Sequence, residues 1–275
     1  MNKVIVVKLK PGYAVITGFA NMSTENPLVL AQSEGKSKSD LKSESKLGET
    51  DLSLLLTEGL RKLEGEIGPI SEDAKIYGVC SDELANGEGT NALSALANKG
   101  ILCLSESIKR IAELVKREVG DTLIVDVGIG SVKVCSAMGT FPVRWTLYDT
   151  QKDYDSGDTA GNSSLEDIKD VKEFVGLLGM EAQTISAAVR KHLNDVSFSE
   201  QIDSRWIIGT GKGLIEIPSG LELLKESLRD IEELPIGEVP ILLDRSQILD
   251  SLGVLVPDYD QASWQLLRES LGVES

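Results

Sequence analysis

The residues with the clearest chemical potential follow an apolar segment near the middle of the chain. Leu123–Val127 is typical of a strand, and it carries Asp126 next to its end, followed by Gly128, Gly130 and Ser131. Glycines at this spacing allow a tight turn whose backbone N–H groups can face a phosphate, and Ser131 adds a hydroxyl. A carboxylate at this place can hold a metal-bound water. The alternative is a β-hairpin in which the glycines only form the turn.

A second glycine-rich segment, Gly209, Thr210 and Gly211, follows the strand predicted at residues 205–208. It precedes a helix-forming sequence, and a turn in this position can pack against an adenine base or direct N–H groups at phosphate. Its spacing matches neither the P-loop nor the GxGxxG fingerprint of dinucleotide-binding proteins. A simple tight loop is therefore the alternative interpretation.

The elements that must position these residues indicate an α/β protein. Strands are predicted at residues 4–7, 13–17, 27–31, 74–80, 101–104, 122–127, 131–137, 143–148 and 205–208. Helices are predicted at residues 51–67, 89–98, 105–119, 165–178, 181–193, 221–232, 246–252 and 261–271. A strand-rich start followed by alternating helices and strands occurs twice, which favours two related α/β subdomains.

The boundary between the subdomains is predicted near Gly120-Asp121, which gives an N-terminal subdomain 1–120 and a C-terminal subdomain 121–275. Residues 33–50 are rich in Ser, Lys and Glu and are interpreted as a flexible surface loop.

The composition limits the partners and the compartment. A formal net charge of −16 disfavours nucleic acid and anionic membranes as partners. Three cysteines, Cys80, Cys103 and Cys135, lack metal-site spacing and indicate free thiols in a reducing compartment. The single histidine, His192, is interpreted as a cation at a helix C-terminus. With no apolar run of membrane-spanning length, we expect a cytoplasmic protein.

Three segments of the C-terminal half carry a resemblance to a known family. Asp126–Val134, Ile207–Gly213 and Ile241–Leu255 are similar to the phosphate, adenosine and closing motifs of the glutamate mutase accessory proteins, the MutL family encoded near cobalamin-dependent mutases. The resemblance covers roughly residues 120–271.

This family resembles the actin, Hsp70 and sugar-kinase ATPase superfamily. The resemblance implies two RNase H-like subdomains around a nucleotide cleft, ATP or ADP with Mg²⁺ as cofactors, and a chaperone-like role towards a protein partner such as a cobalamin-dependent mutase. It implies that Asp126 is the catalytic and metal-holding residue. The cofactor-binding residues implied are Gly128, Gly130, Ser131, Gly209, Thr210 and Gly211.

The sequence departs from the family pattern at two turns. Ser131, Val132 and Lys133 stand where the family usually has Thr-Thr-Asp, so Lys133 replaces an acid. The first phosphate turn is expected to resemble Asp-Phe-Gly-Ser-Thr-Thr, whereas Val7–Tyr13 contains no Asp, Ser or Thr. Mg²⁺ that bridges phosphates needs such groups nearby.

Two functions therefore stay open. One is a divergent actin-like ATPase that serves as a reactivating factor, and the other is a pseudo-ATPase that acts as a binding or scaffold subunit. A small-molecule kinase is less favoured because no catalytic base is evident between the halves.

Overall fold

The computed structural model describes residues 3–10, 13–36, 49–85, 87–128, 131–139, 142–149, 171–195, 205–232, 234 and 239–273. The chain divides into two compact units. Unit 1 contains Met1–Leu114 and Ile248–Ser275, and unit 2 contains Val115–Gln247. Within the described part of the chain, no helix combines the length and apolarity needed to cross a bilayer.

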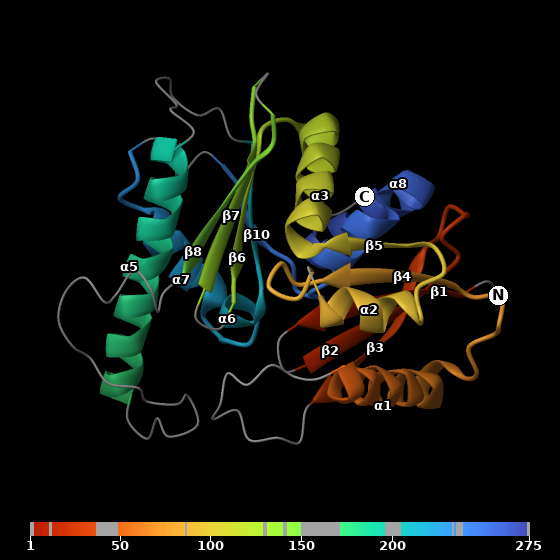
Figure 1. Ribbon diagram of the computed structural model, residues 1–275. Coiled ribbons are helices and arrows are strands. Elements are labelled where there is room, and N and C mark those ends of the chain that lie inside the picture. Colours follow the sequence, from red (N-terminus) through yellow and green to blue (C-terminus); the bar gives the residue numbers. More distant parts are fainter. Residues whose placement is uncertain are drawn as a thin grey trace. The chain divides into compact units, whose positions relative to one another are not determined.

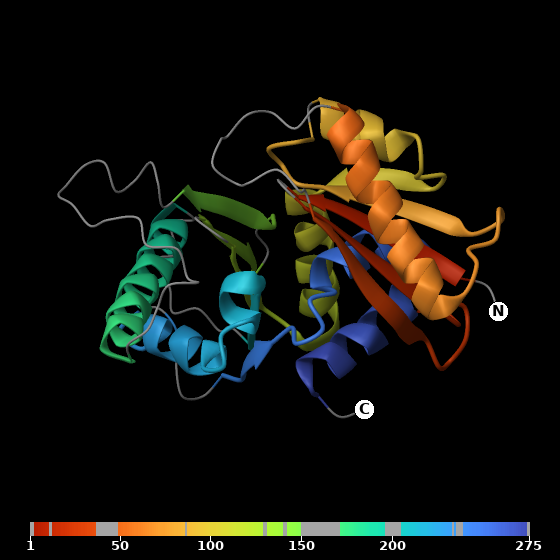
Figure 2. The ribbon, with the colours of Figure 1, turned by 90° about the horizontal axis from the view of Figure 1, so that it is seen from below.

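Unit 1 is built on a five-stranded sheet in the order β3-β2-β1-β4-β5. Its strands are β1 (Lys3–Lys10), β2 (Tyr13–Ala20), β3 (Leu28–Lys36), β4 (Lys75–Cys80) and β5 (Gly100–Cys103). Its helices are α1 (Glu49–Ile67), α2 (Glu88–Ser94) and α8 (Leu249–Leu271), and α3 (Leu104–Val119) runs from unit 1 into unit 2. Helices α1 and α2 cover one face of the sheet, and α8 lies on the other face (Figures 1 and 2).

The two faces of β1 carry different residues because side chains alternate along a strand. Ile5, Val7 and Leu9 belong to the apolar core that α1 and α2 close. The intervening position, Lys8, is directed to the opposite face, where it contacts Asp250 of α8.

The sheet of unit 2 has the strand order β10-β9-β6-β7-β8. Read from the β8 edge, this order corresponds strand for strand to that of unit 1. Its strands are β6 (Thr122–Val127), β7 (Ser131–Ala137), β8 (Arg144–Asp149), β9 (Trp206–Thr210) and β10 (Ile241–Leu243). Its helices are α5 (Val171–Asp195), α6 (Lys212–Ile215) and α7 (Gly220–Leu228). In each unit the central strand pairs antiparallel on one side and parallel on the other. The predicted α/β class and the internal duplication of the pattern are therefore confirmed.

Several predicted elements differ from the structure. Residues 33–36 of the predicted flexible loop belong to β3, because they pair with β2 and the Ser33 hydroxyl donates to the Gly59 carbonyl at 2.7 Å. Residues 49–50 begin α1, and residues 37–48 lie outside the described residues. Strand β10 was not among the predicted strands. Part of the helix predicted at 165–178 also lies outside the described residues.

The C-terminal helix belongs to unit 1, whereas the sequence suggested the C-terminal subdomain for it. Its contact with β1 depends on side chains more than two hundred positions apart, as in the Lys8–Asp250 pair.

His192 lies in the last turn of α5, so the predicted place at a helix C-terminus is confirmed, but the residue is wholly buried and the interpretation as a cation is wrong. Its Nδ1 lies 2.7 Å from the Thr146 hydroxyl, and its Nε2 lies 2.8 Å from the Ser136 hydroxyl. Burial lowers the pKa of His192 to about 4, against a smaller opposing effect of the Asp195 charge. The imidazole is therefore neutral at physiological pH and links α5 to β7 and β8.

We expect this histidine to make the protein sensitive to acid. The unfolded state takes up a proton near pH 6.5, whereas the folded state does so only near pH 4. Stability is therefore fully present above pH 6.5 and falls by up to about 3 kcal/mol as the pH decreases to 4. Chemical denaturation of the wild type and His192→Gln across this range should show a shallower acid-side decline in the variant. Parallel declines in the two proteins would contradict the assignment.

Candidate functional site

The carboxyl ends of three parallel strands of unit 2 meet at one edge of its sheet. Asp126 near the end of β6 pairs in register with Thr210, the last residue of β9. Strand β10 continues the row, because Leu243 pairs with Gly209 and Asp244 follows. In open α/β sheets, ligands bind at the carboxyl edge of parallel strands. The two predicted motifs are thus brought together here.

Gly211 joins the two motifs by direct contact. Its φ of 92° lies in the region that favours glycine. A Cβ at this position would overlap Oδ1 of Asp126 and the carbonyl oxygen of Val127. A Cβ on Gly213 would lie 2.7 Å from a methyl group of Val127. The turn after β9 can therefore pack on the end of β6 only because these positions carry no side chain.

The turn after β6 contains a hairpin contact. The Gly128 N–H donates to the Ser131 carbonyl at 2.9 Å, and β6 and β7 pair antiparallel on either side. The β-hairpin, which the sequence analysis gave as the alternative interpretation of this turn, is confirmed. The Gly128 amide is thereby used within the hairpin, and Gly130 lies outside the described residues.

Thr210 and Gly209 have clear structural partners. The Thr210 hydroxyl donates to Oδ2 of Asp244 at 3.0 Å, and the Asp244 N–H donates to the Gly209 carbonyl at 2.9 Å. A Cβ on Gly209 would lie 2.6–3.0 Å from methyl groups of three leucines, so the core itself requires glycine here. Asp244 was not among the predicted site residues, although its place directly after an apolar triplet is a signal that could have found it.

Two mostly buried residues of opposite charge lie side by side without forming an ion pair. Asp126 is 5% exposed and Lys133 is 7% exposed. They are register partners on β6 and β7, so both side chains are on the same face of the sheet. Among the described residues, neither charged group forms an ion pair or a hydrogen bond. Neither the Asp126 carboxylate oxygens nor the Lys133 Nζ is among the buried atoms that lack a hydrogen-bond partner, so both charged ends reach solvent and are open to a ligand.

The side chains at this edge suit a metal ion that is held mainly by water and by oxygens of the ligand. Among the described residues, no group of three or more His, Cys, Asp or Glu side chains is placed to hold one. Mg²⁺ commonly keeps several waters and takes one or two carboxylates together with phosphate oxygens of the ligand. The unpartnered carboxylate of Asp126 suits this arrangement and would be the residue that holds Mg²⁺, through a bound water.

Unit 1 carries a lysine where unit 2 carries the aspartate. Lys8 on β1 pairs in register with Val79 on β4, as Asp126 on β6 pairs with Thr210 on β9. Lys8 and Asp126 are each the fifth residue of the segment that pairs with the neighbouring parallel strand. Lys8 is buried, and its Nζ lies 2.7 Å from Oδ1 of Asp250.

Asp250 is held in its charged form by two lysines. Burial raises the pKa of this carboxyl, but the charges of Lys8 and Lys10 outweigh burial and keep it below its usual value. The Nζ of Lys10 lies 3.7 Å from Oδ2 of Asp250. The position in unit 1 that corresponds to Asp126 is therefore occupied by an internally neutralised pair.

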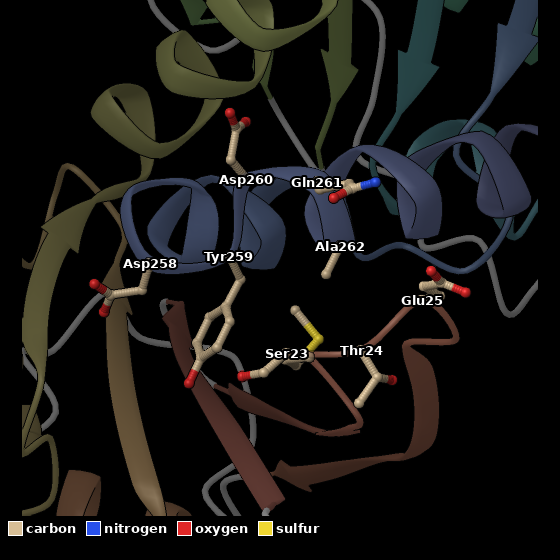
Figure 3. Close-up of a pocket in the computed structure, with 9 residues that line it drawn as sticks. Ser23, Thr24, Glu25, Asp258, Tyr259, Asp260, Gln261 and Ala262 are labelled. Carbon is tan, nitrogen blue, oxygen red and sulfur yellow. The ribbon is translucent and has the colours of Figure 1, made fainter.

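A separate pocket of about 370 Å³ lies in unit 1 between the β2–β3 turn and the interruption of α8 at Tyr259. Figure 3 shows the Tyr259 ring reaching towards the turn, whereas Asp260 and Gln261 point away from it. Asp258 accepts a hydrogen bond from the Tyr77 hydroxyl. None of the predicted site residues lines this pocket.

Comparison with solved structures identifies the fold. Component A of (R)-2-hydroxyglutaryl-CoA dehydratase from Acidaminococcus fermentans matches with a TM-score of 0.52 and 12% identity, over 96% of this chain and 100% of that one. The activator of 2-hydroxyisocaproyl-CoA dehydratase from Clostridium difficile, with bound ADPNP, gives 0.51 and 12%, over 96% of both chains. The ethanolamine utilization protein EutJ from Carboxydothermus hydrogenoformans gives 0.57 and 12%, over 92% and 89%.

These likenesses show that the chain has the two-domain α/β fold of actin-like ATPases, as the sequence predicted. No protein-family model and no curated protein sequence matches the chain. The narrower resemblance to the MutL family stays a prediction.

Gly211→Ala should damage the junction of the two motifs. The positive φ and the overlap with Asp126 are expected to lower the free energy of unfolding by about 1–3 kcal/mol. The matched control is Gly65→Ala, at an exposed position of α1 with no atom within 4 Å of the added methyl group. Alanine there should stabilise slightly, because it favours the helix. Equal effects of the two substitutions in urea unfolding would refute the close packing.

Asp250→Asn should destabilise unit 1 by about 3–5 kcal/mol, because it leaves the Lys8 ammonium buried without its partner. The double variant Lys8→Met with Asp250→Asn should regain most of this loss in a denaturant titration. A double variant that is no more stable than Asp250→Asn alone would contradict the pairing.

Proposed function

We propose that this chain is a divergent actin-like ATPase that binds an adenine nucleotide, with the phosphates at the carboxyl edge of the unit 2 sheet. The observation that carries the proposal is the pair of opposite charges on Asp126 and Lys133, which have no partner among the described residues and whose charged ends reach solvent at the carboxyl edge of the sheet. A nucleotide phosphate with its metal ion presents both an anion and a cation, which is what these two groups lack. The fold supports the same proposal, because one similar solved structure contains bound ADPNP.

Each residue of the edge has a role in this proposal. Asp126 orients a metal-bound water, and a bound Mg²⁺ would supply charge neutralisation for the phosphates. The Ser131 hydroxyl donates to phosphate oxygens, whereas the Gly128 N–H is used by the hairpin and Gly128 lines the turn without a side chain. Gly211 allows the backbone after β9 to lie against Asp126, and Gly209 and Thr210 shape the adenosine side.

We further propose an accessory role towards a protein partner in the cytoplasm. Two of the similar structures are named as a component or an activator of a dehydratase. Together with the MutL-like segments, this favours a reactivating or chaperone-like factor for a cobalamin-dependent mutase. The net charge of −16 disfavours a nucleic-acid partner.

A pseudo-ATPase is the second candidate, and the Lys8–Asp250 pair favours it. An actin-like ATPase of full activity needs acidic or hydroxyl groups from both phosphate turns. Here the corresponding position of unit 1 is a lysine neutralised within the chain. Under this candidate, nucleotide binding persists or is lost, hydrolysis does not occur, and the chain serves as a binding subunit.

Nucleotide binding should raise the melting temperature of the protein by several degrees. Ligand at one hundred times its Kd stabilises the folded state by about 2.7 kcal/mol. Asp126→Asn should weaken Mg-ADP binding roughly tenfold or more, because the charged acceptor is lost. The control is Asp230→Asn, at an exposed position of unit 2.

No shift with ATP or ADP at millimolar concentration would reject nucleotide binding. Release of phosphate from bound ATP separates the two candidates. Turnover that Asp126→Asn abolishes supports the ATPase, whereas binding without turnover above the buffer rate supports the pseudo-ATPase.

A further inference from the structure

We infer that Cys80 and Cys103 form a redox site, at which a low-molecular-weight disulfide such as oxidised glutathione converts the two thiols into one reversible internal disulfide. Both cysteines are free thiols in the structure. They belong to unit 1, whereas the proposed nucleotide site belongs to unit 2. The redox site therefore goes beyond the proposed function, and loss of nucleotide binding would not affect it.

Neighbouring strands hold the two cysteines beside each other. Cys80 is the last residue of β4 and Cys103 is the last residue of β5, and they are register partners in the parallel pairing of these strands. Figure 1 shows β4 and β5 next to each other at one edge of the unit 1 sheet. Neighbouring strands lie about 4.7–4.9 Å apart, and the Cα atoms of a disulfide usually lie about 4.4–6.8 Å apart. The backbone spacing therefore suits a disulfide without rearrangement of the sheet.

The two side chains also lie on the same face of the sheet. Cys80 belongs to the apolar core on the side of α1 and α2, and Ile101 of β5 packs against this core. Cys103 follows Ile101 by two residues, so its side chain lies on the same face as that of Ile101. Both side chains are therefore on one side of two adjacent strands, as a disulfide between them requires.

The two thiols differ in their access to solvent. Cys80 is 1% exposed, and Gly89 of α2 lies so close that a Cβ there would be 2.9 Å from the Cys80 sulfur. Burial raises the pKa of the Cys80 thiol to about 11, against a smaller opposing effect of Thr90, and the charge of Cys103 contributes to the increase. Cys103 is only partly buried and lies on the edge strand β5. An external reagent therefore reaches Cys103 first.

Polar contacts fix the Cys103 sulfur at the end of β5. The Ser105 hydroxyl donates to Oδ1 of Asp82 at 2.6 Å, and the Ser105 N–H donates to the same oxygen at 3.2 Å. The Cys103 sulfur lies 3.3 Å from the Ser105 hydroxyl oxygen. Because the Ser105 proton is directed to Asp82, the Cys103 thiol is the donor in this contact. The sulfur is thus held beside the strand that carries Cys80.

The reaction consists of two successive thiol–disulfide exchanges. Cys103 loses its proton to water, and its thiolate attacks one sulfur of oxidised glutathione, whose S–S bond breaks so that one glutathione leaves and takes up a proton. Cys80 then loses its proton, and its thiolate attacks the Cys103 sulfur, which breaks the mixed disulfide and releases the second glutathione with a proton. Two protein thiols are oxidised, and one oxidised glutathione is reduced to two thiols.

The position of the bond makes it reversible. It joins β4 to the edge strand β5 and closes a loop that contains α2. The sheet fixes both Cα atoms, so the bond cannot relax freely to its preferred geometry, and strained disulfides are the easily reduced ones. We therefore expect the thiol pair to follow the ratio of oxidised to reduced glutathione.

The test is incubation of the full, folded chain with oxidised glutathione, followed by intact-mass measurement and peptide mapping. The wild type should lose two hydrogen atoms and give one cross-linked peptide that joins Cys80 to Cys103. Excess reduced glutathione should restore both thiols. A bond that involves Cys135, or one that forms only after unfolding in urea, would overturn the inference.

Three variants separate the two steps. Cys80→Ala should stop at the first step and accumulate one glutathione on Cys103. Cys103→Ser should slow the release of reduced glutathione roughly tenfold or more, because both remaining cysteines are buried. Cys135→Ala, which removes the buried thiol of unit 2, is the control and should form the bond as the wild type does.

Two results with these proteins would contradict the site. One is a wild type that keeps a stable mixed disulfide on Cys103, because Cys80 would then be out of reach. The other is a Cys103→Ser protein that consumes oxidised glutathione as fast as the wild type. This second comparison stays decisive if Cys80→Ala is too unstable to purify, because position 103 is only partly buried.

Discussion

Gly211 lies so close to strand β6 that no side chain can be accommodated between them. This contact holds the turn after β9 against Asp126 and Val127, although the two segments are far apart in the sequence. The parallel pairing of β6 with β9 brings both turns to the same edge, and the missing Cβ lets them touch. The proposed nucleotide site depends on this packing, because it turns two short glycine motifs into one surface.

The two units use one topology for different chemistry. Strand order and pairing direction agree, so Lys8 and Asp126 occupy corresponding places. In unit 1 the charge is neutralised inside the chain by Asp250 of α8. In unit 2 the charges on Asp126 and Lys133 have no partners among the described residues. The buried Lys8–Asp250 pair contributes to the fold, whereas the Asp126 and Lys133 side chains, which are not paired within the described residues, are suited to a ligand.

The sequence was sufficient for the α/β class and for most strands, because their apolar runs are long and bounded by turn residues. It was insufficient where long-range contacts decide the structure. Residues 33–36 look solvated, yet β-pairing and the Ser33 hydrogen bond include them in β3. Strand β10 has only three residues and offers little periodicity. The burial of His192 and the unpaired state of Lys133 depend on neighbouring strands, which a one-dimensional pattern does not reveal.

Hydrogen exchange with and without ADP tests the central claim most directly, since it reports where the ligand acts on the backbone. We expect slower exchange in peptides that cover residues 122–139 and 205–216 together, because both turns face one ligand. Protection confined to the unit 1 pocket of residues 22–25 and 258–262, or to neither region, would contradict a phosphate site at the edge where Gly211 meets Asp126.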